Sequence, residues 1–116
     1  MLDEAVCLAG HPVEVAFQTA GVTPDAADIA RYWEVEFYWP QIWQSVLSKL
    51  GNELEDDGAD GERSDFLAKA RPRYLEFFGT AAECEWELVL EPEIYGGHIV
   101  TMRMAHHQCY DFRLDG

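Results

Sequence analysis

Residues 84–91 read Cys-Glu-Trp-Glu-Leu-Val-Leu-Glu, an alternation of acidic and apolar side chains that is typical of a half-buried β-strand. A turn over residues 92–97, which include one Pro and two Gly, separates this strand from a second one over residues 98–105. Residues 108–114 alternate in the same way after a short connection. The sequence therefore predicts a three-stranded antiparallel meander in the C-terminal third of the chain.

The strongest helical pattern lies in the middle of the chain. From Trp39 onward, apolar side chains recur at i, i+4, i+7, i+8, i+11 and i+15, which predicts an amphipathic helix from about Pro40 to Leu54. Pro40 has no N–H to donate and disfavours helical geometry in the residue before it. A break or kink is therefore expected at Pro40.

An earlier helix is expected to begin at Thr23-Pro24-Asp25, which combines a capping hydroxyl, a proline at the first helical position and an acid near the helix dipole. Its apolar residues up to about residue 38 would share one helical face. Residues 33–39 also alternate as a strand would, so residues 32–38 remain open between helix and strand; the lack of a turn residue before them favours helix. The residues on the helical face are Ala26, Ile29, Ala30, Trp33 and Phe37.

A third helical segment is expected to begin at Ser64 and to end at Gly79, with a second kink at Pro72. Residues 13–17 alternate as a strand, and residues 2–8 fit either a short helix or a partner strand. The apolar face of the third helix would hold Leu67, Ala70, Tyr74 and Phe77 or Phe78.

Together these segments predict one α+β domain over residues 1–116. Three helices, two of them kinked by proline, would pack on an antiparallel sheet that consists mainly of the C-terminal meander. An N-terminal strand would extend this sheet. The length of 116 residues is typical of a single domain with one core.

The chain is strongly acidic, with 22 Asp and Glu against 8 Lys and Arg and a formal net charge of −14. Such a charge repels nucleic acid phosphates and anionic membranes and attracts basic surfaces, so we expect no direct nucleic acid binding and no membrane association. Three widely spaced cysteines, an acidic N-terminus and the lack of a long apolar run favour a cytoplasmic protein. The bias toward Ala, Asp and Arg is typical of a GC-rich bacterial genome.

The acids are clustered, and two clusters are candidates for a partner-binding face. One surrounds an exposed loop at about residues 55–62, and the other alternates along the strand that begins near residue 84. Solvation alone also favours both clusters. The candidate partner-binding residues are Glu53, Glu55, Asp56, Asp57, Asp60, Glu83, Glu85 and Glu87.

Histidine and cysteine side chains, most of them in the C-terminal third of the chain, are candidate metal ligands or a candidate catalytic pair. They lack the Cys-x-x-Cys or His-Glu-x-x-His spacing that supports a zinc site, and the acidic surroundings favour a neutral thiol over a nucleophilic thiolate. We therefore expect no metal, no cofactor and no catalytic residue. The side chains concerned are His98, His106, His107, Cys109, Cys84 and Cys7.

Two functions fit these observations. The first is a small interaction domain that binds a basic protein, as inhibitors, immunity proteins and nucleic-acid mimics of this size and charge do. The alternative is a ligand-binding domain or enzyme with an aromatic pocket between helices and sheet, although an enzyme is the less favoured of the two. Its walls would be Trp33, Tyr38, Trp43, Trp86 and Tyr110, with Glu36, His98 or Tyr110 as polar groups.

Overall fold

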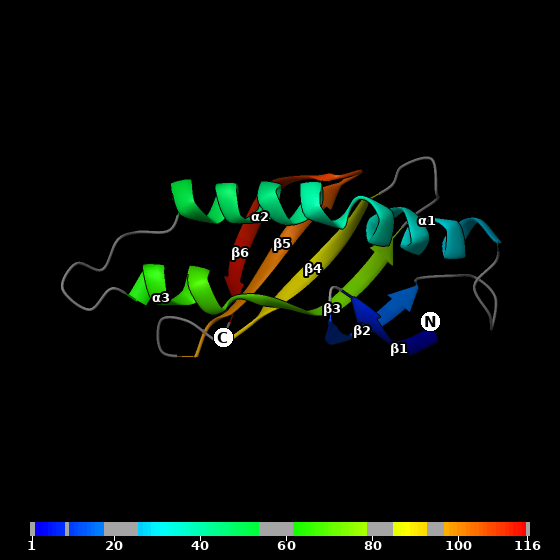
Figure 1. Ribbon diagram of the computed structural model, residues 1–116, viewed down its shortest axis with the longest axis horizontal. Coiled ribbons are helices and arrows are strands. Elements are labelled where there is room, and N and C mark those ends of the chain that lie inside the picture. The colour runs from blue at the N-terminus through cyan, green and yellow to red at the C-terminus, as the bar shows by residue number, and fades with distance from the viewer. Residues whose placement is uncertain are drawn as a thin grey trace.

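The computed structural model describes residues 2–8, 10–17, 26–53, 62–78, 85–92 and 97–115. Among these residues, three helices lie on one face of a six-stranded sheet (Figure 1). In chain order the elements are β1 (Leu2–Leu8), β2 (His11–Phe17), α1 (Ala26–Phe37), α2 (Trp39–Glu53), α3 (Glu62–Lys69), β3 (Arg71–Phe78), β4 (Glu85–Glu91), β5 (Ile99–Ala105) and β6 (Gln108–Asp115).

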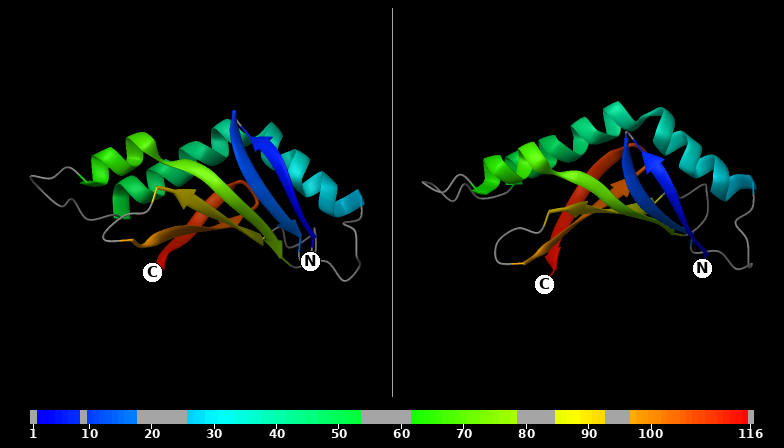
Figure 2. Two further views of the ribbon diagram at one scale, coloured as in Figure 1. Left: turned by 90° about the horizontal axis from the view of Figure 1, so that it is seen from below. Right: turned by 60° about the horizontal axis from the view of Figure 1, so that its bottom comes forward.

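The strands lie in the sheet in the order of the sequence, from β1 to β6. Every neighbouring pair is antiparallel except β2 and β3, which are parallel. A parallel pair needs a long crossover, and the three helices supply it between β2 and β3 (Figure 2). The α+β class and the meander β4–β5–β6 are therefore confirmed, and the N-terminal strand is present as part of a β1–β2 hairpin.

The third helix is shorter than its apolar pattern predicts, and the prediction of helix over residues 71–78 is wrong. α3 begins before Ser64 and ends at Lys69, and the residues after it form strand β3. Pro72 lies where the register between β3 and β4 shifts, at a point in a sheet that tolerates a residue without an N–H. The expected stop at Gly79 lies outside the described residues. The helical spacing had combined apolar residues of two successive elements.

Residues 32–38, which the sequence left open, are helical up to Phe37, and Tyr38 is the single turn residue between α1 and α2. The amide and the carbonyl oxygen of Tyr38 each make a main-chain hydrogen bond of 3.0 Å with a residue four positions away. Pro40, which lies between the two donors Tyr38 and Ile42, has no N–H and donates no main-chain hydrogen bond. The chain changes direction there as predicted (Figure 2). The predicted start at Thr23-Pro24-Asp25 lies outside the described residues.

Side chains from all three helices and from β1–β5 form one hydrophobic cluster between the helices and the sheet. α2 contributes Ile42, Val46 and Leu50, which are spaced by four residues and are fully buried. Trp86 of β4 is 1% exposed, and its indole N–H donates a 2.8 Å hydrogen bond to the carbonyl oxygen of His106. Within the described part of the chain, no helix has the length and apolar character that crossing a membrane requires.

Candidate functional site

The face of α1 that points away from the sheet is apolar. Ile29, Trp33 and Phe37 lie on it at intervals of four residues and are 44%, 59% and 77% exposed. Ala26 and Ala30 are exposed on the same face. These five residues, called here the outer face of α1, are the apolar helical face that the sequence predicts, but the fold leaves it in solvent.

The opposite face of α1 is buried and contains a charge. Arg31, Tyr32 and Val35 all lie in the interior, and Arg31 is only 4% exposed. Its guanidinium donates hydrogen bonds of 2.7 and 2.9 Å to the carbonyl oxygens of Phe78 and Glu85, at the end of β3 and the start of β4. Turning α1 to bury its apolar face would break both bonds. Arg31 therefore acts together with the buried Tyr32 and Val35 to hold this face of the helix toward the interior.

Glu34 borders the outer face of α1 and is held by the β5–β6 turn. Its carboxylate oxygen Oε1 lies 2.9 Å from Nε2 of His107. The imidazole of His107 in turn stacks on the ring of Tyr38, with 4.2 Å between ring centroids. A carboxylate has room for about four hydrogen bonds, so this contact orients Glu34 without using up its acceptor capacity.

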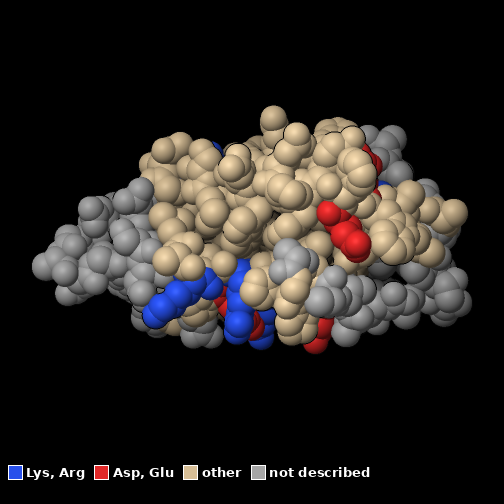
Figure 3. Space-filling view, viewed as in Figure 1, with Lys and Arg blue, Asp and Glu red and all other residues tan. Residues whose placement is uncertain are grey.

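Glu36 is exposed on the other flank of the outer face, so acidic side chains stand on both of its sides. A mainly apolar hollow of about 430 Å³ opens between the two flanks. In Figure 3, the surface over α1 and α2 consists mostly of uncharged side chains with few acids among them. The residues that line the hollow are Trp33, Glu34, Glu36, Phe37 and Tyr38.

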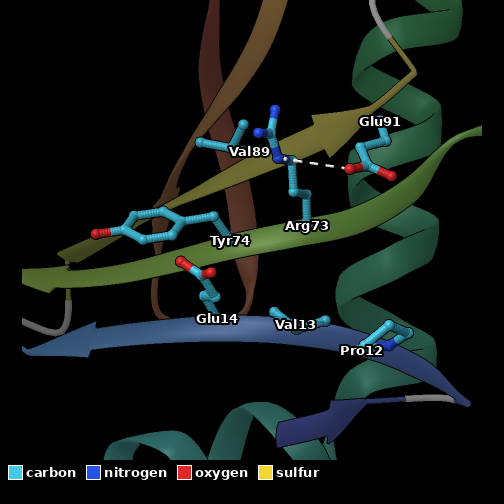
Figure 4. A pocket seen from close by; sticks show the side chains of 7 residues that line it. All are labelled: Pro12, Val13, Glu14, Arg73, Tyr74, Val89 and Glu91. Carbon is cyan, nitrogen blue, oxygen red and sulfur yellow. Dashed lines mark ion pairs between the residues drawn. The ribbon is translucent and has the colours of Figure 1, made fainter. Parts of the chain in front are cut away.

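Basic side chains gather elsewhere, near α3 and the start of β3 (Figure 3). Arg71 and Arg73 form ion pairs of 3.0 and 3.4 Å with the two carboxylate oxygens of Glu91. Arg73 and Glu91 also line an open hollow of about 510 Å³. Figure 4 shows the ion pair of Arg73 with Glu91 and, further along the strands, the side chains of Glu14 on β2 and Tyr74 on β3. The paired charges give this open hollow no clear preference for a ligand of either sign.

The acidic candidates are placed unevenly. Glu85 is exposed, whereas Glu87 lies 3.9 Å from the guanidinium of Arg103 and 3.5 Å from that of Arg113. The two arginines offset the charge of Glu87, so the alternating glutamates of β4 do not form a uniform negative row along its described residues. The positions of Glu55, Asp56, Asp57, Asp60 and Glu83, and the side chain of Glu53, lie outside the described residues.

The structure brings together two of the five aromatic residues proposed as pocket walls. Trp33 and Tyr38 border the hollow beside α1. Trp86 belongs to the core, where helix and sheet side chains pack around it, Trp43 is half-buried on α2, and Tyr110 is exposed on β6. These aromatic side chains therefore lie in four different environments and do not surround one cavity between helices and sheet.

Among the histidine and cysteine candidates, His106, His107 and Cys109 lie around the β5–β6 turn, whereas His98 lies at the other end of β5. His98 and His106 stand at opposite ends of β5, about 26 Å apart along the strand. Burial raises the pKa of the Cys109 thiol, which donates a hydrogen bond to the carbonyl oxygen of Asp111 at 3.2 Å and is therefore a poor nucleophile near neutral pH. No three His, Cys, Asp or Glu side chains converge as a metal site within the described ranges. Cys7 and Cys84 have no described side chains.

Sequence reasoning missed two features of this arrangement, the buried Arg31 and the contact between Glu34 and His107. Nothing local marks Arg31, because its hydrogen-bond acceptors lie 47 and 54 residues away. The pairing of Glu34 with His107 spans 73 residues and also has no local signal. Comparison with protein family models, with curated proteins and with solved structures gives no match to this chain.

Proposed function

We propose that this chain is a protein-interaction domain that binds a basic protein partner, in the manner of an inhibitor, an immunity protein or a nucleic-acid mimic. The observation that supports it is the outer face of α1, where Ile29, Trp33 and Phe37 are exposed between Glu34 and Glu36. Large apolar side chains surrounded by charged ones are typical of the centre and rim of a protein interface.

The size of this face fits an interface centre. A large aromatic side chain exposes up to about 150–250 Å². From their exposed fractions, the three large side chains leave roughly 300–400 Å² of apolar surface in solvent. Contiguous apolar patches on soluble proteins rarely exceed a few hundred Å², and those of this size are often functional. The fold has therefore left in solvent an apolar area that a partner would bury.

The charge argues for a basic partner rather than a second copy. Two copies would each carry a net charge of −14, and pairing their outer faces would bring the flanking glutamates close together. A partner with lysine or arginine around an apolar patch would meet Glu34 and Glu36 with complementary charge. Such complementarity speeds encounter at low ionic strength and makes binding sensitive to salt.

Affinity capture with matched variants tests this function. The wild-type chain, a Trp33→Ser/Phe37→Ser variant and a Tyr110→Ala control would each be immobilised and exposed to lysate at low salt. Bound proteins would be eluted at high salt and identified by mass spectrometry. Tyr110 is a suitable control because it is an aromatic side chain that is 48% exposed and belongs to β6 rather than to α1.

We expect one basic protein to bind stoichiometrically to the wild-type chain and to the control, and to be lost from the double variant. Equal capture of that protein by the double variant would show that the outer face of α1 is not the binding site. A specific partner that is acidic, or whose binding does not weaken with salt, would contradict the proposed function itself.

A further inference from the structure

The large and small side chains on the outer face of α1 are arranged in rows, as on surfaces where helices pack. Ile29, Trp33 and Phe37 form a ridge of large side chains at intervals of four residues, about 12 Å long. A parallel row at the same interval contains Ala26 and Ala30, whose side chains are much smaller than those of the ridge, and by the rules of helix packing such a row is the groove beside the ridge. Helices pack by fitting such ridges into the grooves of a neighbouring helix.

These rows and the charges beside them favour one kind of occupant. The main chain of α1 makes its hydrogen bonds within the helix, so it offers no edge to which an extended strand could add. The row that begins with Ala26 and Ala30 continues to Glu34, where His107 orients the carboxylate. A helix seated in the groove would therefore bring a side chain near this carboxylate, and a lysine or arginine there would form a charge-assisted contact.

We propose that the partner presents an amphipathic α-helix that packs against the outer face of α1, with apolar residues in the groove beside Ala26 and Ala30 and basic residues at Glu34 and Glu36. This inference rests on the proposed function and adds the conformation of the partner's binding segment. A lipid surface is the competing occupant of an exposed apolar helix face. The glutamates on both flanks and the net charge of −14 disfavour it.

Designed peptides test the helical conformation. The probe is a fluorescent peptide of about 18 residues with leucine at i, i+3, i+4 and i+7 and lysine on both sides of the leucine stripe. One matched peptide has proline in the middle of the stripe, and another has glutamate in place of every lysine. Binding would be measured by fluorescence anisotropy at low and high salt, and helix formation by circular dichroism of the mixture.

We expect the lysine peptide to bind and to gain helix, the proline peptide to bind roughly a hundredfold more weakly, and the glutamate peptide not to bind. Trp33→Ser/Phe37→Ser should remove binding of the lysine peptide, and Tyr110→Ala should leave it unchanged. Glu34→Gln/Glu36→Gln should weaken binding at low salt more than at high salt.

Different results would contradict the helical conformation of the partner and the basic character of the partner. Equal binding of the lysine and proline peptides, or binding without a gain in helix, overturns the helical partner but leaves a basic partner in place. Binding of neither the lysine nor the glutamate peptide also overturns the helical partner alone, because affinity capture tests the basic partner separately. Equal binding of the lysine and glutamate peptides overturns both. Cosedimentation of the wild-type chain, but not of Trp33→Ser/Phe37→Ser, with vesicles of zwitterionic or anionic phospholipid would make the outer face of α1 a membrane contact and would overturn the helical partner.

Discussion

Replacing Arg31 should destabilise the fold far more than replacing an exposed arginine. Arg31→Leu removes the two hydrogen bonds that the guanidinium donates to the carbonyl oxygens of Phe78 and Glu85, and a hydrogen bond that involves a charged group contributes about 1.5–3 kcal/mol. It also removes the contact of the guanidinium with the ring of Phe77, 5.2 Å from the ring centroid, a contact worth about 0.5–2 kcal/mol.

Part of this loss is offset because leucine does not place a charge in the interior. The expected net loss is about 2–4 kcal/mol in the free energy of unfolding. In a domain of this length, that loss lowers the melting temperature by roughly 8–16 °C. The stability of Arg31→Lys should fall between those of wild type and Arg31→Leu, because a lysine ammonium lacks the fork that reaches two carbonyl oxygens at once.

Urea unfolding followed by circular dichroism measures the effect. Arg113→Leu is the matched control, because Arg113 is half-exposed and its 3.5 Å ion pair with Glu87 is worth at most about 1 kcal/mol. If Arg31→Leu unfolds at the same urea concentration as Arg113→Leu, then Arg31 does not fix the orientation of α1 in the way described.

Three further outcomes follow from the packing. Ile42→Ala should lower the free energy of unfolding by about 2–5 kcal/mol in urea titration, since Ile42 is fully buried in α2; a loss below about 1 kcal/mol would contradict its place in the core. Trp33→Ser, in contrast, should change stability by no more than about 0.5 kcal/mol in the same titration, because its side chain is 59% exposed; a large loss would mean that Trp33 supports the fold. Burial raises the pKa of Cys109, so less thiolate is present at pH 8 than in an unfolded chain. Iodoacetamide should therefore label Cys109 more slowly in the folded protein, and the labelling rate should still rise above pH 9. Equal labelling rates of the folded and unfolded chains, measured by peptide mapping with mass spectrometry, would refute this.

The parts of the fold that have a local periodic signal could be predicted from the sequence. The apolar repeat of α2 and the alternation of β4 each come from neighbouring residues, because one face of each element is buried. The helix over residues 71–78 was wrong for a related reason. Its pattern joined apolar residues of α3 and β3 across Ala70, and the proline that looked like a kink belongs to an irregular point in a strand.

The candidate site depends on contacts that no local pattern encodes. The apolar face of α1 was correctly grouped, but the sequence contains no sign that it points to solvent. That orientation depends on the burial of Tyr32 and Val35 and on Arg31, which reaches main-chain oxygens at the end of β3 and the start of β4. A lone arginine on a helix is ordinarily a solvated residue, and only the tertiary structure turns the face that carries it toward the core.

The most direct test compares the affinity of Trp33→Ala and wild type for the basic partner identified by capture, measured by isothermal titration calorimetry. Trp33 exposes 59% of its surface at the centre of the outer face of α1, and burying it should contribute about 2–4 kcal/mol, or roughly a 30- to 700-fold change in Kd. Tyr110→Ala should change Kd less than about threefold. Equal affinities of wild type and Trp33→Ala, with both proteins folded, would contradict the assignment of this face as the binding site.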